Sequence, residues 1–234
     1  MASSRVRWLA LLPASKGVTE GGRGAAWTDV ASPEALAVTR AHSDADDLLA
    51  APTRPARDRY DGVVHRSSAL DTLDPPGRRR HARHVAYVSA LAGLVRATEP
   101  LPAYRLEMAA KLEPVGGLAA YWRPHVTAAL DAALAPGARV WMLTGGEYAR
   151  AVIVPDGRRT VDVAFVETAA TGEKSLPSAT VKQARGQLAR ALVDHPDIAR
   201  HPDHDRWGDV RLTAAGRILA LREATADAQT WTWV

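Results

Sequence analysis

The sequence contains no cysteine among its 234 residues. Disulfide bonds, thiolate catalysis and cysteine-ligated metal sites are therefore excluded. It also lacks an apolar run long enough to cross a bilayer, so we expect no membrane-spanning helix and a cytoplasmic location. Residues 1–17 combine two arginines with a short apolar run. A glycine-rich turn follows this run instead of a small-residue cleavage site, so Val6–Leu12 is interpreted as a first strand and not as part of a signal peptide.

Lysine is scarce in this chain. Only four lysines occur among the 30 Lys and Arg residues, at positions 16, 111, 174 and 182. Arginine stays protonated in proteins, whereas a desolvated lysine can lose its proton and act as a base or a nucleophile. A lysine that is retained in an arginine-rich chain is therefore a candidate for chemistry.

The overall composition is that of a moderately basic globular protein. Hydrophobic residues make up 47% of the chain, charged residues make up 24%, and the net charge is +4. This balance permits contact with DNA or another polyanion without requiring it. The basic residues gather in Pro75–His84, where the candidates for phosphate contact are Arg78, Arg79, Arg80 and Arg83. The alternative interpretation of this segment is a solvated basic helix that precedes a buried strand.

The stretch Tyr87–Met108 organises the rest of the prediction. Its first part is short and apolar, which is typical of a strand buried on both faces. Pro100 and Pro102 then exclude a continuing helix and favour an extended turn. In an extended backbone, Arg105 and Glu107 share one face. Such a turn either builds a site or holds a structural Arg–Glu ion pair at the edge of the core.

The order of the expected elements indicates an α+β protein, with a mixed β-sheet and flanking helices in a single compact domain over residues 1–234. We also expect a monomer. The expected strands are Val6–Leu12, Tyr60–Val64, Val85–Leu91, Arg139–Leu143, Thr160–Val166, Val210–Leu212 and Arg217–Leu221. The expected helices are Ser32–Ala51, Pro75–His84, Leu118–Leu134 and Ser178–Val193.

Two His-Pro-Asp units within His195–Asp205 invite a comparison with metal sites. Prolines break the helical periodicity of this segment, and no cysteine complements the histidines. A closed set of four ligands is not apparent, so we interpret the segment as a polar loop and predict no structural zinc and no cofactor.

The segment SALAGLVRATEPLPAYRLEM, residues 89–108, resembles the signature of the peroxide-stress (YaaA-type) family, and YRLEM is its most specific part. The resemblance continues through Tyr121–Trp122, Glu147–Tyr148, Lys182 and Arg185–Gly186, and an N-terminal PASKG matches in part. It implies a mixed α and β fold and a stress protein that binds DNA and limits peroxide damage.

Two departures from the family pattern matter. The family usually presents a lysine directly before a threonine in the first loop, whereas Val18 occupies that slot here and Lys16 stands two residues earlier. The helical insert between this loop and Tyr60 is also shortened, and we find no helix-hairpin-helix element in it. The second departure weakens the expectation of DNA binding.

An enzyme acting on a small nucleoside-like or heterocyclic substrate is the alternative function. We predict that Lys16, Arg105, Glu107, Glu147, Lys182 and Arg185 face one cavity. The two arginines would hold an anionic group, a lysine would act as base or nucleophile, and Glu107 would orient it or transfer protons. Ser15 and Tyr104 are further candidates for ligand contact. The alternative is that the pairs Arg105–Glu107 and Glu147–Arg185 are structural ion pairs.

Overall fold

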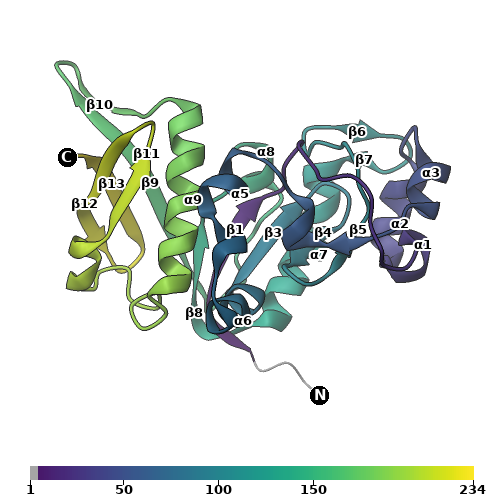
Figure 1. The fold of residues 1–234 in the computed structure, drawn as a ribbon, viewed down its shortest axis with the longest axis horizontal. Coiled ribbons are helices and arrows are strands. Elements are labelled where there is room, and N and C mark those ends of the chain that lie inside the picture. Colours follow the sequence, from purple (N-terminus) through teal and green to yellow (C-terminus); the bar gives the residue numbers. More distant parts are fainter. Residues whose placement is uncertain (1–4) are drawn as a thin grey trace.

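The fold is built on a mixed sheet of nine strands (Figure 1). The computed structural model describes residues 5–234, so the first residues of the stretch weighed above as a signal peptide lie outside it. The strand order is β11-β12-β13-β9-β8-β1-β3-β4, with β10 paired to β9. The α+β class with a mixed sheet and flanking helices is confirmed, while the number of domains stays a prediction. No helix within residues 5–234 is both long and apolar enough to span a membrane.

The centre of the sheet is parallel. β1 (Val6–Pro13) lies between β3 (Val85–Ser89) and β8 (Leu134–Met142), and β9 (Arg159–Ala169) follows β8. Residues 8–12 are buried with at most 1% exposure, so β1 is covered on both faces. This pattern confirms the interpretation of the N-terminal apolar run as a buried strand.

Antiparallel strands extend the sheet at both ends. β4 (Gly93–Arg96) pairs with β3 at one edge. At the other end, β13 (Ala228–Trp233) pairs in parallel with β9 and antiparallel with β12 (Arg217–Thr225). The two strands expected near Val210–Leu212 and Arg217–Leu221 are present as β11 (Arg211–Ala214) and β12, which pair antiparallel as a hairpin. The remaining strands are β2 (Arg54–Pro55), β5 (Pro100–Leu101), β6 (Lys111–Leu112), β7 (Gly116–Gly117) and β10 (Gly172–Ser175).

The longer helices cover the two faces of the central strands. α5 (Val63–Ser68) and α6 (Pro75–His84) lie on the connection from β1 to β3, and α7 (Leu118–Ala133) lies on the connection back across the sheet to β8. Because right-handed crossovers that run in opposite directions leave a sheet on opposite sides, α6 and α7 cover opposite faces (Figure 1). α9 (Ser178–Asp194) joins the layer of α5 and α6.

The region between β1 and α5 differs from the prediction. The single helix expected over Ser32–Ala51 is wrong, because α2 (Pro33–Arg40) and α3 (Ala45–Ala50) are separate. Polar side chains at 42–44 bond locally to the chain between them, which competes with helical hydrogen bonds. The short elements of the fold are α1 (Trp27–Val30), α4 (Ala56–Arg59), α8 (Glu147–Arg150), η1 (Leu70–Thr72) and η2 (Asp205–Asp209).

The strand expected over Tyr60–Val64 is also wrong. Tyr60 forms only an isolated bridge with Val18, and the helix α5 begins at Val63. The apolar residues Val63 and Val64 are too few to distinguish a strand from a helix that packs on a neighbour. This difference matters because α5 lies beside the cavity described below.

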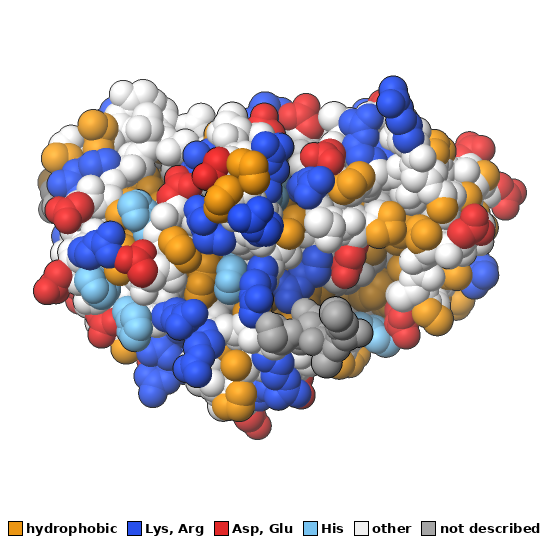
Figure 2. Space-filling model, turned by 60° about the horizontal axis from the view of Figure 1, so that its bottom comes forward, with side chains coloured by type: hydrophobic (Ala, Val, Ile, Leu, Met, Phe, Trp, Pro, Cys, Tyr) orange, Lys and Arg blue, Asp and Glu red, His pale blue; other side chains and the backbone are white. Residues whose placement is uncertain are grey.

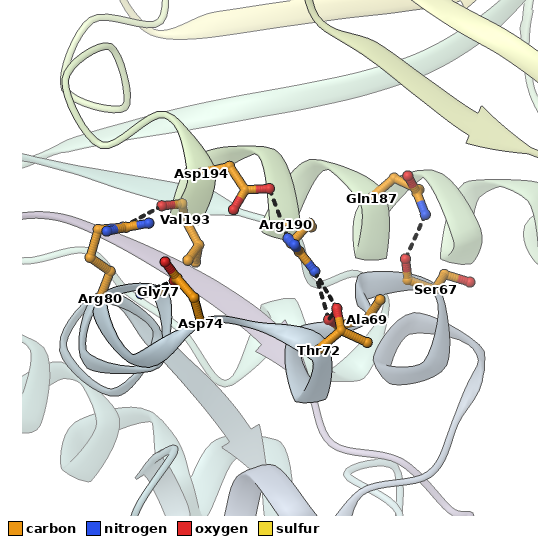
Figure 3. Close-up of polar contacts among 10 residues, drawn as sticks. All are labelled: Ser67, Ala69, Thr72, Asp74, Gly77, Arg80, Gln187, Arg190, Val193 and Asp194. Atoms are coloured by element: carbon orange, nitrogen blue, oxygen red, sulfur yellow. Dashed lines mark hydrogen bonds and ion pairs between the residues drawn. The ribbon is translucent and has the colours of Figure 1, made fainter.

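Polar side chains tie α9 along its length to the segment from α5 to α6 (Figure 3). Gln187 donates to the Ser67 carbonyl at 2.7 Å, and Arg190 donates to the Ala69 carbonyl at 2.8 Å. Near the end of α9, the Arg80 guanidinium donates to the Val193 carbonyl at 2.7 Å. These bonds satisfy carbonyls at helix ends and set the position of α9 relative to the sheet.

Candidate functional site

A cavity of about 310 Å³ lies at the carboxyl ends of β1 and β8. Its walls come from five separated segments: residues 13–16 after β1, residues 62–65 at the start of α5, Glu107, residues after β8, and α9. The side chains that carry charge there are Lys16, Glu107, Lys182 and Arg185. The cavity therefore combines three cations with one carboxylate and favours an anionic ligand.

The place of this cavity follows from the topology of the sheet. The chain leaves β1 towards β3 on one side, and it leaves β8 towards β9 on the other side. Where two adjacent parallel strands send their connections in opposite directions, a crevice opens outside their carboxyl ends, and α/β proteins bind ligands in such crevices. Pro13 and Ser15 line the cavity from the β1 side, and Gly145 lines it from the β8 side.

Lys16 and Glu107 form an ion pair across the cavity wall. Their side chains are 72% and 49% exposed, so water screens the pair and its contribution to stability is small. An exposed pair of this kind rearranges easily when a charged ligand arrives. Beside it, the Ser15 hydroxyl accepts the Gly17 N–H at 3.1 Å, which shapes the loop that carries Lys16.

Arg185 has no hydrogen-bond or ion-pair partner among residues 5–234. Its guanidinium is half-buried, and burial lowers the pKa of Arg185 from its usual value. Gly145 leaves room for it, because a Cβ on Gly145 would lie 2.9 Å from both terminal guanidinium nitrogens. A half-buried cation without a partner gains stability when an anion reaches it. Lys182, one turn earlier on α9, is exposed and likewise has no hydrogen-bond or ion-pair partner within the described chain.

Glu107, Lys182 and Arg185, which line the cavity, belong to the motifs that resemble the YaaA-type family. The profile of the family described as "Peroxide stress protein YaaA" matches residues 27–199. The chain belongs to this family. The match includes the region between Thr28 and Arg59, where the resemblance was weak, and it does not include the partly matching PASKG at residues 13–17.

Individual proteins that are similar to this chain support the same family assignment. The chain is 34% identical over 147 residues to a UPF0246 protein of Streptomyces coelicolor, which covers 63% of this chain and 56% of that protein. It is 36% identical over 153 residues to one of Corynebacterium efficiens (64% and 58%) and 32% identical over 166 residues to one of Methylibium petroleiphilum (69% and 64%). The chain thus spans less than two thirds of the length of these relatives.

One YaaA-family motif residue has a clear structural role. Gly186 lies on α9 where this helix crosses α5, and a Cβ there would lie 2.3 Å from the Val64 carbonyl oxygen. Only glycine permits this close approach, which places Arg185 of the same motif beside the cavity.

Two of the six residues predicted to face one cavity do not line it, and neither does Tyr104. Arg105 lines a different hollow of about 360 Å³. Glu147 pairs with Arg150 at 2.6 Å within α8, and its neighbour Tyr148 lines the cavity instead. Neither of the structural pairs considered from the sequence, Arg105–Glu107 and Glu147–Arg185, is present among the described contacts.

Tyr104 belongs to a buried hydroxyl network. Its hydroxyl lies 2.8 Å from the Tyr60 hydroxyl and 2.7 Å from Ser89 Oγ. Burial raises the pKa of Tyr104 well above its usual value, so this phenol stays protonated. The network lies next to the cavity, because the ring of Tyr60 packs 5.1 Å from the ring of His65, which lines the cavity.

Sequence reasoning missed His65, Gly145 and Tyr148. His65 was hidden because its segment was expected to begin as a strand, and in α5 its ring lines the cavity. Tyr148 stands next to Glu147 in the motif, so only the backbone direction after Gly146 decides which of the two faces the cavity. Gly146 adopts a φ of 57°, which reverses the chain at this point.

The four arginines of α6 have different environments. Arg78 and Arg79 are exposed, Arg80 donates to the Val193 carbonyl, and Arg83 is exposed. Figure 2 brings forward the side of the molecule where α6 lies, and Lys and Arg side chains gather there. For metal, no group of three or more His, Asp or Glu side chains able to hold an ion is found within residues 5–234.

Proposed function

We propose that this YaaA-family protein is an enzyme that binds a small anionic, nucleoside-like or heterocyclic substrate in the cavity between β1 and β8. The observation that carries the proposal is the convergence of Lys16, Lys182 and Arg185 with Glu107 at the topological switch point of the sheet. A small crevice of about 310 Å³ with excess positive charge suits a small acid better than it suits a duplex, which needs an extended face.

Each charged residue has a role in this proposal. Arg185 holds a phosphate or carboxylate group of the substrate through its fixed fork of donors. Lys182 is exposed and forms no ion pair within the described chain, so its amine is free to reach the substrate, and it serves as base or nucleophile. Glu107 orients Lys16 through their ion pair, and this pair transfers protons to and from the bound substrate.

Calorimetric titration tests the proposal. Purified protein is titrated with nucleoside 5′-monophosphates and with heterocyclic carboxylates at neutral pH. We expect saturable binding of at least one of them, and a loss of about tenfold or more in affinity for Arg185→Gln. Arg222→Gln serves as the matched control, because Arg222 pairs with Glu173 on the strands far from the cavity. If no compound binds saturably, the proposal is wrong.

DNA contact during peroxide stress is the second candidate function. The exposed Arg78 and Arg79 support it, together with the gathering of basic side chains in Figure 2. We propose weak, sequence-independent contact with phosphates on this face, which limits oxidative damage. The two functions use separate surfaces, so each is tested by its own variants.

A further inference from the structure

His65 is the one histidine among the residues that line the cavity. It lies on α5, and its ring packs between the rings of Tyr60 and Tyr87, at centroid distances of 5.1 and 5.4 Å. These contacts fix the orientation of the imidazole. A ring held in one orientation keeps each of its two nitrogens in one place.

The hydrogen bonds of His65 decide which nitrogen carries the proton. Nε2 lies 3.0 Å from the carbonyl oxygen of Pro13. A carbonyl oxygen can only accept, so Nε2 must be the donor. In the neutral ring Nδ1 then holds a free lone pair, and it has no partner among the residues that the structure describes.

The charge state of the ring agrees with this assignment. Burial lowers the pKa of His65 to about 4, so the ring is neutral at physiological pH. The charged groups that face it act in opposite directions: Asp61 raises the pKa and Arg66 lowers it. The cavity is therefore lined by one neutral histidine beside its three cations and its carboxylate.

We infer that Nδ1 of His65 accepts a hydrogen bond from an N–H or O–H group of the ligand, and that His65 thereby selects a ligand with such a donor. This inference rests on the proposed function, since it concerns the same cavity. The ligand class becomes narrower: an acid whose anionic group lies at Arg185 and whose ring bears an unsubstituted N–H. The 6-oxopurine nucleotides have this combination.

The selectivity has a physical basis. A ligand with a methyl group in place of the N–H leaves Nδ1 without a partner in a half-buried site, and it also brings the methyl group against the ring. Sites built to bond a substrate N–H reject analogues that lack it, because a buried polar group is then left unpaired. The Pro13 carbonyl keeps its bond to Nε2 in both cases.

Two variants of His65 separate a ligand contact from a structural role. In His65→Gln the amide nitrogen can reach the position of Nε2, so the bond to Pro13 is kept and the acceptor at Nδ1 is lost. In His65→Asn the amide oxygen takes the position of Nδ1, so the acceptor is kept and the bond to Pro13 is lost. Thermal unfolding of both variants shows whether they are folded.

The probes are inosine 5′-monophosphate and its N1-methyl derivative. We expect the wild-type protein to bind the first about tenfold more tightly than the second. His65→Gln should bind both with the same, weakened affinity, while His65→Asn should keep the preference for the N–H compound. These results together would establish the contact.

Other outcomes overturn the inference. It is wrong if His65→Gln keeps the wild-type affinity and preference while Arg185→Gln loses binding, and in that case the proposed function stands. It is also wrong if the wild-type protein binds both probes equally, or binds other acids but not inosine 5′-monophosphate. If the protein binds no acid at all, the proposed function falls together with the inference.

Discussion

Among the charged side chains that line the cavity, Arg185 is the one that is half-buried and has no counter-ion among residues 5–234. Thr144, just before Gly145, adds a buried hydroxyl without a partner at the end of β8. Proteins rarely leave buried polar groups unsatisfied, and functional sites are the usual exception. A bound acid that reaches Arg185 would satisfy its guanidinium.

At this scale the first prediction concerns Lys182. Lys182→Met should weaken the binding of inosine 5′-monophosphate by about tenfold, because it removes a cation from the cavity. It should also abolish the enzymatic activity, because it removes the proposed base or nucleophile. The melting temperature should change by about 2 °C or less, since the side chain is exposed and forms no ion pair with any residue from 5 to 234. Lys174→Met, which removes an exposed lysine paired with Glu167, is the control. A large loss of stability with unchanged binding would assign Lys182 a structural role.

The second prediction concerns buried histidines. His81 is 2% exposed and bonds to the Tyr87 hydroxyl at 2.8 Å, and burial lowers the pKa of His81 to about 4 from 6.5. The unfolded chain therefore binds more protons than the folded protein between these values, and stability falls as the pH drops through this window. His81 alone should cost about 2 kcal/mol between pH 7 and pH 5.

Urea unfolding at pH 7 and pH 5 measures this effect. His81→Gln should reduce the difference in unfolding free energy between the two pH values, whatever its absolute stability. Part of the difference should remain, because the pKa of His65 is lowered in the same direction. An unchanged difference in His81→Gln would show that His81 does not titrate with unfolding.

At the scale of elements, α9 decides where the cavity cations lie. It carries Lys182 and Arg185, and bonds from Gln187 and Arg190 join it to the carbonyls of the α5–η1 segment (Figure 3). On the opposite side of the loop after β1, buried Arg59 donates to the Thr19 and Leu101 carbonyls. Both arginines donate to backbone carbonyls, and Arg190 also pairs with the Asp194 carboxylate at 2.7 Å, so they act as anchors of the chain.

The third prediction tests the contact between α9 and α5. Gly186→Ala should destabilise the protein by about 2–3 kcal/mol, because the new methyl group meets the Val64 backbone and forces the helices apart. Gly208→Ala is the control, since a Cβ there meets no atom within 4 Å. Chemical unfolding compares the two variants. Equal free energies of unfolding for the two variants would mean that α9 and α5 can move apart without loss of stability.

At the scale of the whole molecule, the fourth prediction concerns DNA. Fluorescence anisotropy should detect weak duplex binding that falls steeply as salt rises. Replacing Arg78 and Arg79 with Ala should reduce the slope against log salt concentration by about 2, because each removes one phosphate contact. Arg80 is left unchanged, since its bond to Val193 is structural.

A matched pair of changes provides the control for DNA binding. Arg159 and Arg222 lie on β9 and β12 and pair with Asp227 and Glu173. Their replacement by Ala should leave the salt slope unchanged. If both double variants behave alike, or if no binding occurs at low salt, the basic face of α6 does not bind DNA.

Strong local patterns made most of the fold predictable. β1 and β3 are continuous apolar runs, and α7 and α9 have a helical period of apolar residues, so their positions followed from the sequence. The errors fall in the region between β1 and α6, where elements are two to eight residues long between turns. A segment as short as Val63–Ser68 has too few residues to show a period, so tertiary packing on α9 decided its structure.

The sequence by itself determined which residues carry charge and which motif positions are present, and this was enough to single out Lys16, Glu107, Lys182 and Arg185. It could not determine which of them meet, because they come from segments up to 169 positions apart whose relative placement depends on the order of the strands. Arg105 and Glu147 stand within two residues of cavity-lining positions and still lie outside it. The direction of one side chain depends on a single backbone dihedral angle, and only the packed structure sets that angle.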